Sequence, residues 1–425
     1  MSISILRDGA AYSNLNPNLV LLSENGCGRA TAYTDANKII TLQDKTHVAW
    51  LDSIAEGFRV RARTLDRSMD QWSPTYTVGE AYDNHGGPAL TVDSQGYLHI
   101  VYYPHLHPFR YRRSVRPNDA SEWENEIEVG ERCTYPMMVC GPDDTLYLTG
   151  RQSRGSEPWY VNLYIKPPNV PWQEPITVFQ DDEGGYVCFQ QQLAWGQDYR
   201  TLHMTLCIFD ENRSYTIGYL RSPDSGKTWE RADGTPVSLP ATRETVTLID
   251  TEHKDLSSGS TAVDTEGTPH ILYCTCPFYS LPSEAWIIWL DKSGKWCRRS
   301  LAAELSKGWE GWSPGPSSAL HIAPDGRIFG VLSLLNLDTL SENNWGHKSS
   351  EIIGLQAPDI DGKFSVELLS KPDESVPHWF PNLERPTGHN HVDHPGVIYT
   401  AGVAGEGCDD ILSNGVYWTQ MRSQS

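Results

Sequence analysis

The chain has 425 residues, a formal net charge of −20 at pH 7 and a hydrophobic content of 39%. With 35 glycines, 28 prolines, 15 tryptophans and 20 tyrosines spread among short apolar runs, the composition favours one large β architecture over helical domains. The negative charge argues against a nucleic-acid partner, because phosphate neutralisation needs a basic surface.

No segment looks like a membrane or targeting element. No run approaches the roughly 20 apolar residues of a membrane span, so we expect no membrane partner. The N-terminal stretch MSISILRDGAAYSNLNPN lacks a basic region followed by an apolar core, so no signal peptide is visible. We therefore expect a cytoplasmic protein, or a secreted one if the sequence has been trimmed. The nine scattered cysteines indicate buried, reduced thiols.

A hairpin pattern recurs seven times along the chain: an apolar run, a turn rich in Asp and Gly, and a run of aromatic and β-branched residues. In chain order the copies are KIITLQDKTHVAWLD, ALTVDSQGYLHIVYY, MMVCGPDDTLYLTGR, QLAWGQDYRTLHMTLCIF, TAVDTEGTPHILYCT, ALHIAPDGRIFGVLS and GHNHVDHPGVIYTAG. Seven aromatic-marked turns alternate with them, at Trp72, Trp123, Trp172, Trp229, Trp296, Phe364 and Trp418. Four strands in roughly 50–65 residues are typical of a propeller blade. The sequence predicts an all-β, seven-bladed β-propeller with four-stranded antiparallel blades, as a single domain over residues 1–425.

One of these turns carries a complete Asp-box. The segment SPDSGKTW, which ends at Trp229, matches the pattern S-x-D-x-G-x-T-W, and the segments at 291–296 and 359–364 are degenerate copies. We expect Asp224 to accept backbone hydrogen bonds, Gly226 to be left-handed and Trp229 to pack between blades. The motif is structural and indicates no catalytic role.

Four residues with useful chemistry lie at equivalent positions of two neighbouring blades. In a blade, the start of the innermost strand and the end of the second strand lie on the same face. His85 and His105 occupy these positions in the second blade, and Tyr135 and Arg151 occupy them in the third. We therefore expect the four side chains to converge beside the central channel.

Further cationic and imidazole side chains are expected on the same face. Arg213, His107 and Arg154 are candidates for substrate binding. We expect four more histidines on this rim: His347, His389, His391 and His394.

An imidazole, a phenol and a guanidinium together suit β-elimination from a uronic acid. Arginine binds and neutralises the carboxylate, a base removes the C5 proton, and an acid protonates the departing oxygen. Lowering the pKa of a tyrosine by ~3 units costs about 4 kcal/mol, whereas a histidine of pKa ~6.5 is already largely neutral at pH 7. We expect His85 or His105 to be the base, Tyr135 the acid and Arg151 the neutraliser. The alternative is that Tyr135 serves as both acid and base.

The chain resembles the BNR-repeat seven-bladed propellers that include ulvan lyases and the rhamnose–glucuronate lyases acting on plant gums. The resemblance is sharpest in NHGGPALTVDSQGYLHIVYYPHLHPFRYRRS and TYPMMVCGPDDTLYLTGR. The paired histidines of that family fall on His85 and His105, its tyrosine on Tyr135 and its arginine on Arg151. The resemblance implies a lyase that cleaves a polysaccharide or oligosaccharide beside a glucuronate or iduronate linked to rhamnose, with no cofactor required for the chemistry.

The resemblance also raises the question of a metal, because some relatives carry a structural zinc or calcium. His389 and His391 in HNH are the candidate ligands, with Cys276 and His347 as further donors. We expect the protein to be a monomer.

Two other functions remain open. One is a glycoside hydrolase of rhamnosidase or sialidase type, but sialidase chemistry needs a tyrosine nucleophile with an arginine triad, and the R-I-P signature is missing near the start. The other is a non-catalytic carbohydrate-binding propeller, in which the rim residues would bind a glycan without turnover.

Overall fold

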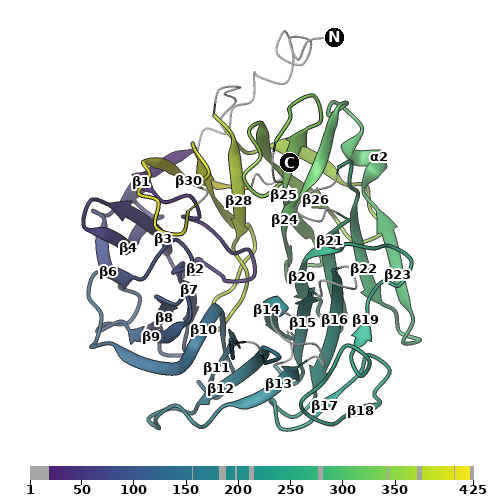
Figure 1. The fold of residues 1–425 in the computed structure, drawn as a ribbon, viewed down its shortest axis with the longest axis horizontal. Helices are drawn as coiled ribbons and strands as arrows, with labels where there is room; N and C mark the ends of the chain where they lie inside the picture. Colours follow the sequence, from purple (N-terminus) through teal and green to yellow (C-terminus); the bar gives the residue numbers. More distant parts are fainter. Residues whose placement is uncertain are drawn as a thin grey trace.

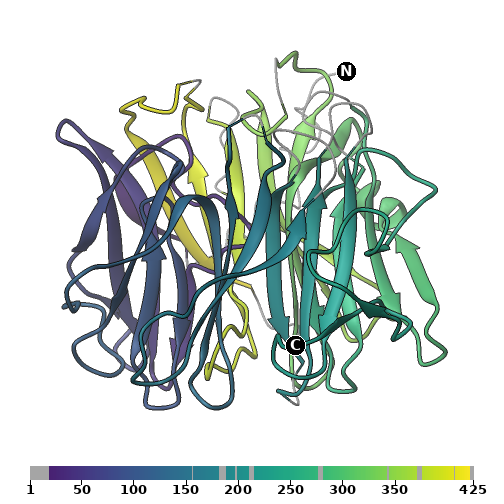
Figure 2. The same cartoon turned by 60° about the horizontal axis from the view of Figure 1, so that its bottom comes forward.

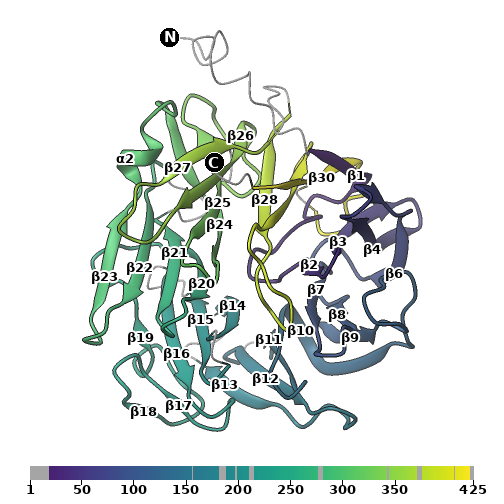
Figure 3. The same cartoon turned by 180° about the vertical axis from the view of Figure 1, so that it is seen from behind.

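The chain forms an all-β ring. The structure, a computed structural model, describes residues 19–155, 157–180, 188–196, 199–209, 215–275, 281–341, 344–370, 376–405 and 407–421. Antiparallel sheets stand around a central axis in chain order, and the ring is seen from both faces in Figures 1 and 3. Figure 2 shows the strands running steeply between the two faces. The described part of the chain contains a single short helix, α2 (Ala302–Leu305), and no helix long and apolar enough to cross a membrane.

The described strands form five hydrogen-bonded sheets. The first has the order β28 (His378–Leu383), β29 (Gly396–Ala401), β30 (Asn414–Gln420), β1 (Val20–Gly26), β3 (Lys45–Ile54), β4 (Gly57–Asp66) and β5 (Gln71–Trp72), with β2 (Ile39–Leu42) on β3 and β6 (Tyr76–Ala81) on β4. The second has the order β13 (Ile176–Gln180), β12 (Tyr160–Lys166), β11 (Leu146–Gln152), β10 (Ile127–Cys140), β9 (His107–Arg113), β8 (Leu98–Tyr102) and β7 (Ala89–Val92).

The remaining three sheets complete the ring. The third contains β14 (Cys188–Trp195), β15 (Leu202–Ile208), β16 (Thr216–Ser222), β17 (Trp229–Glu230) and β18 (Pro236–Val237), with β19 (Thr247–Leu248) on β16. The fourth contains β20 (Ser257–Val263), β21 (Pro269–Cys274), β22 (Ala285–Leu290) and β23 (Trp296–Ser300). The fifth contains β24 (Trp312–Ile322), β25 (Ile328–Asn336), β26 (Ser350–Ala357) and β27 (Ser365–Leu368).

Strands from the two ends of the chain close the ring. β1 pairs antiparallel with β30, with Val20 opposite Trp418. The long strand β10 joins two groups of strands, because its first part pairs with β9 and its second part pairs with β11. An irregular register between Thr134 and Met137 lies in that second part.

Six of the seven hairpins predicted from the sequence are present as strand pairs, from β2–β3 to β24–β25. The seventh prediction is wrong in its first half. Residues 388–395 form no strand, and the inner strand of this hairpin is β28, which ends earlier at Leu383. The three histidines of GHNHVDH therefore lie in the connection between β28 and β29.

Neighbouring sheets pack face against face. One core cluster joins Met137 and Tyr147 of the second sheet to Leu193 and Met204 of the third. Burial of each such aliphatic side chain stabilises the fold by roughly 1.5–3 kcal/mol. The turn that ends at Trp229 lies at this junction, and the indole packs in the same cluster. These contacts fix the sheets beside one another and hence the loops that they carry.

The Asp-box turn is held by its own side chains. The carboxylate of Asp224 accepts a hydrogen bond from the backbone N–H of Thr228 at 2.7 Å. Gly226 has a φ of +88°, which a Cβ would strain. The buried indole of Trp229 donates to the carbonyl of Gly226 at 3.2 Å. The contacts tie the turn to the sheet without involving any candidate site residue.

We predict that the fold loses stability between pH 7 and pH 5 because of two buried histidines outside the candidate site. Burial lowers the pKa of His47 to about 4 and that of His321 to about 4. In the unfolded chain these groups titrate near ~6.5, so below that pH the unfolded state binds more protons and the native state loses stability. At pH 5 the loss is roughly 2 kcal/mol for each histidine. Denaturant unfolding at both pH values measures it.

A matched variant separates this effect from other titrations. The Nε2–H of His47 donates to Asn118 at 2.8 Å, and a glutamine amide can make the same hydrogen bond. His47→Gln should therefore lose less stability between pH 7 and pH 5 than the parent protein. An equal loss in both proteins would assign the acid sensitivity to other groups.

Candidate functional site

The four residues predicted to converge do lie together. His85 and His105 flank the β7–β8 hairpin, and their rings stack with centroids 4.0 Å apart. The ring of Tyr135, in β10, has its centroid 6.5 Å from that of His85. The guanidinium of Arg151, in β11, lies 4.6 Å from the centroid of the Tyr135 ring. Arg151 lies close to Tyr135 because of the register of the β10–β11 pair, in which Arg151 is opposite Thr134, the residue before Tyr135.

A carboxylate that sequence reasoning passed over organises the two imidazoles. The buried Asp83 accepts from the backbone N–H of His85 at 2.8 Å and lies 3.2 Å from its Nδ1. Its other oxygen lies 2.5 Å from Nδ1 of His105. Because a carboxylate only accepts, Nδ1 of each imidazole carries a proton, and in the neutral tautomer the lone pair is on Nε2. Burial acts to raise the pKa of Asp83, but the hydrogen bonds from His105 and His85 outweigh it and hold the pKa below its usual range.

Two further residues of the site, Arg29 and Tyr33, come from the connection between β1 and β2 and were also missed. One nitrogen of Arg29 donates to the hydroxyl of Tyr33 at 2.6 Å and to Nε2 of His85 at 2.6 Å. The ring of Tyr33 packs edge-on against that of Tyr135, with centroids 4.6 Å apart. Burial, together with the charge of Arg29, lowers the pKa of His85 to about 4. His85 is therefore neutral at pH 7, and both its ring nitrogens are engaged.

The two residues of the neighbouring hairpin are held rigidly. Arg151 is only 2% exposed, and its guanidinium lies between two rings, 4.6 Å from the centroids of both Tyr135 and Trp159. Tyr135 has a φ of +59°, an outlier for a bulky residue, and its carbonyl accepts a hydrogen bond from Gln191. Such strained backbone persists only where the surroundings enforce it, and it gathers at functional sites. The phenol of Tyr135 is thus aimed by the fold.

The predicted substrate-binding residues have different outcomes. His107, at the start of β9, donates from Nδ1 to the carbonyl of His105 at 2.8 Å, so it adjoins the site. Arg154 follows β11 at the same end as Arg151, is largely exposed and lies 3.8 Å from Glu157. Arg213 lies outside the described residues, as does Cys276 among the proposed metal ligands.

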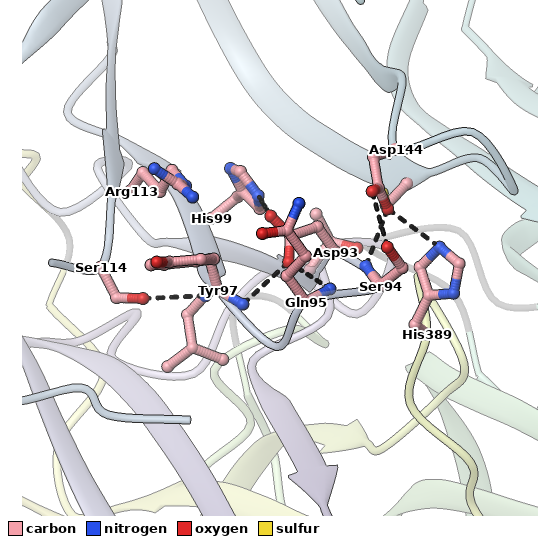
Figure 4. A network of polar contacts seen from close by, with 12 residues as sticks. Asp93, Ser94, Gln95, Tyr97, His99, Arg113, Ser114, Asp144 and His389 are labelled. Atoms are coloured by element: carbon pink, nitrogen blue, oxygen red, sulfur yellow. Dashed lines mark hydrogen bonds and ion pairs between the residues drawn. The ribbon is translucent and has the colours of Figure 1, made fainter. Parts of the chain in front are cut away.

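The expectation that His389 and His394 share the rim of His85 is wrong. His389 contacts the turn between β10 and β11, with Nε2 3.2 Å from the carbonyl of Gly141 and 3.3 Å from Asp144 (Figure 4). That turn is at the opposite end of the hairpin from Arg151. His394 lies 3.4 Å from Arg327, beside the β24–β25 turn. The physical reason is the shifted seventh hairpin, which puts these histidines in a turn between strands.

A cavity of about 210 Å³ lies at this other end of the ring and is distinct from the cluster around Asp83. Its wall includes Trp195, Tyr199, His321 and His391, and none of the four converging residues lines it. His391 therefore also lies away from the predicted site.

Two groups among the described residues have donor atoms close enough to hold a metal ion. The first is Asp83, His85, His105 and Cys408, and the second is Cys140, Asp144 and His389; within each group the donor atoms lie within 4.8 Å of one another. In the first group both oxygens of Asp83 are already hydrogen-bonded to the imidazoles. The second group offers one sulfur, one oxygen and one nitrogen, a set that suits zinc and not calcium. His391 belongs to neither group.

Comparison with known proteins points to one family. A model described as a BNR repeat-containing family member matches residues 45–304. An ulvan lyase from Nonlabens ulvanivorans is 21% identical, with 60% of this chain and 63% of the relative aligned. An ulvan lyase from Alteromonas sp. (strain LOR) is 20% identical, with 59% and 60% aligned. The chain thus spans less than two thirds of the length of these relatives.

Solved structures with the same fold can be superposed on most of the chain. A PL25 ulvan lyase bound to -[GlcA(1-4)Rha3S]- superposes with a TM-score of 0.70 at 14% identity, covering 94% of this chain and 95% of that one. The polysaccharide lyase Uly1 gives 0.61 at 12% identity, covering 96% and 99%. An α-L-arabinanase of Penicillium chrysogenum gives 0.51 at 15% identity, covering 79% and 92%. At such identities these likenesses establish the all-β fold alone.

Proposed function

The chain belongs to the BNR repeat-containing family, whose model matches residues 45–304, and from that premise we propose that it is a polysaccharide lyase acting by β-elimination. The observation that carries the proposal is the joint cluster of two imidazoles on one carboxylate beside a phenol and a guanidinium. The similarity to ulvan lyases supports the same reaction. An α-L-arabinanase with the same fold supports a glycoside hydrolase as the second candidate.

We propose a single seven-bladed propeller as the working unit. β1 is counted with β28–β30, and β10 is divided between its two neighbours, β9 and β11. The strands then fall into seven sets around the axis. In this arrangement the site lies where the second and third blades meet. The protein would act as a monomer, because the cluster is assembled within one chain.

His105 is the better of the two candidate bases. Its Nδ1–H donates to Asp83, which leaves the lone pair on Nε2, and its side chain is 26% exposed. The corresponding lone pair of His85 accepts a hydrogen bond from Arg29 and is not available to a substrate proton. We therefore assign removal of the C5 proton to His105. Asp83 and His85 are positioning residues that fix its tautomer and its plane.

Tyr135 supplies the proton to the departing glycosidic oxygen, and arginine neutralises the uronate carboxylate. Arg151 lies against the face of the Tyr135 ring, so a carboxylate that it binds would be close to the phenol. Neutralisation makes the C5 proton acidic enough for an imidazole to remove, and each proton transfer contributes about 10²–10⁴ in rate. A base, an acid and a neutraliser then complete the elimination without a cofactor.

The proposed substrate is a glycan in which glucuronate or iduronate is linked to rhamnose, as in ulvan or a plant gum. The oligosaccharide bound to the PL25 ulvan lyase, -[GlcA(1-4)Rha3S]-, is such a uronate–rhamnose repeat. The chain carries a net charge of −20, so an acidic glycan must be attracted by local cations such as Arg29, Arg151 and Arg154. A structural zinc, if one is held, would be bound by Cys140, Asp144 and His389 rather than by His389 with His391.

The test of the function is an ultraviolet assay. We expect purified protein, incubated with a panel of uronate-containing polysaccharides, to form an unsaturated uronate that absorbs in the ultraviolet. His105→Ala should slow this reaction by a factor of about 10²–10⁴. Because it also leaves one oxygen of the buried Asp83 without its imidazole donor, it should lower the melting temperature, and circular dichroism checks that the fold is kept. Release of saturated sugar without ultraviolet absorbance would favour the hydrolase, and binding without any product would favour a non-catalytic propeller.

A further inference from the structure

A group of aromatic side chains borders the site on the side of the second blade. It consists of Tyr82, Tyr103 and His107, and we call it the aromatic platform. The ring of His107 lies 4.1 Å from that of Tyr82 and 5.8 Å from that of Tyr103. Tyr82 and Tyr103 have centroids 6.2 Å apart. The guanidinium of Arg110 lies over Tyr103 at 3.7 Å.

The platform is continuous with the proposed catalytic residues. Tyr82 directly precedes Asp83, Tyr103 lies two residues before His105, and His107 lies two residues after it. The backbone N–H of Tyr82 donates to the carbonyl of Tyr103 at 3.2 Å, which joins the two segments. His107 is bonded to the carbonyl of His105 itself. A glycan that places one sugar at His105 would therefore carry its neighbour past these rings.

The exposure of the platform has no evident structural purpose. Tyr82 is 50% exposed, although a single exposed tyrosine would be ordinary. Here three rings join at one rim, and Tyr103 has a φ of +91°, a costly conformation for a tyrosine. Arg110 is held over Tyr103 while it also pairs with Glu126 at 3.3 Å. Strained, pre-ordered aromatic surface is suited to binding the apolar face of a sugar ring.

We propose that the aromatic platform is a subsite that stacks against the pyranose next to the reacting uronate in the same glycan chain. The inference rests on the proposed lyase function, because it takes its direction from His105. The imidazole of His107 packs against one face of the Tyr82 ring and Tyr103 meets that ring edge-on, so the half-exposed Tyr82 offers its remaining surface to a sugar. Arg110 gives the rim a cation beside the stacked sugar. The subsite contributes to affinity and to the choice of longer substrates, and it takes no part in the proton transfers.

The test compares long and short substrates. Tyr82→Ala should lower kcat/KM both on a polymer and on the shortest oligosaccharide that is cleaved, but the loss should be about tenfold larger on the polymer. The extra loss on the polymer should appear as a higher KM and not as a lower kcat. Tyr82→Phe, which keeps the ring, should retain most of the preference. Tyr97→Ala is the matched control, because Arg113 covers Tyr97 at 3.5 Å in the same sheet but at the other end of the strands. It should leave the preference as in the parent protein.

A binding measurement keeps this test apart from the test of the lyase function. A uronate-containing oligosaccharide is titrated into the single variant Tyr135→Phe and into the double variant that also carries Tyr82→Ala. The double variant should bind it with a Kd about tenfold weaker. If the parent protein forms no unsaturated product but this difference in Kd is found, the lyase proposal fails and the subsite stands. An equal Kd in both proteins, or equal losses on long and short substrates, overturns the subsite.

Discussion

Replacing Tyr135 by phenylalanine should lower kcat on a uronate-containing glycan by a factor of about 10²–10⁴, with a smaller change in KM. The variant loses only the hydroxyl that is proposed to protonate the leaving oxygen. The ring that packs against Tyr33 and against the guanidinium of Arg151 is kept. The φ of +59° is imposed equally on both side chains, so the melting temperature should change little. Steady-state kinetics followed in the ultraviolet, together with thermal unfolding, measure both effects.

Two other variants make this result specific. Tyr33→Phe removes the second phenol of the cluster, which accepts a hydrogen bond from Arg29, and should cost less than Tyr135→Phe. A larger loss of kcat in Tyr33→Phe than in Tyr135→Phe would assign the role of the acid to Tyr33. His105→Ala decides whether Tyr135 has one role or two. If Tyr135 were both base and acid, His105→Ala would keep most of the turnover.

The pairing of the catalytic candidates was predictable from the sequence because it depends on local hairpin geometry. His85 and His105 lie at the two ends of one hairpin, and Tyr135 and Arg151 lie at the two ends of the next. Strand alternation and a short turn determine where such ends go. The all-β architecture was predictable for the same reason.

The contribution of Arg29 to the site depends on a contact that no local pattern encodes. Arg29 lies 56 positions before His85, in a connection without strand periodicity, and a tertiary contact between these separate segments brings the two together. Asp83 could have been predicted, because a carboxylate two residues before a candidate histidine can accept its backbone N–H. His389 was assigned to the wrong face because an irregular, histidine-rich connection was taken for an inner strand. Because of that error, His389 was placed at the opposite end of the sheet from the one where it lies.

Replacing Arg151 by methionine should lower kcat/KM by a factor of about 10²–10³, the effect of removing one preorganised donor to a developing charge. Without the guanidinium, the uronate carboxylate keeps its charge and the C5 proton stays weakly acidic. Arg151→Lys should recover part of the rate, because it restores the charge but not the bidentate geometry. Circular dichroism and thermal unfolding serve as controls, since Arg151 is buried between the rings of Tyr135 and Trp159.

The burial of Arg151 makes a purely structural role the natural rival, and a change of substrate separates the two. In a glycan whose uronate is methyl-esterified, the carboxyl group is neutral and the C5 proton is acidified without help from a cation. If Arg151 neutralises charge, the factor by which Arg151→Met lowers kcat/KM should be about tenfold or more smaller on the ester than on the acid. If Arg151 only holds Tyr135 and Trp159 apart, the deficit will be equal on acid and ester. The same pair of substrates applied to Arg29→Met shows which of the two guanidinium groups faces the carboxylate, because only that variant should be relieved by esterification.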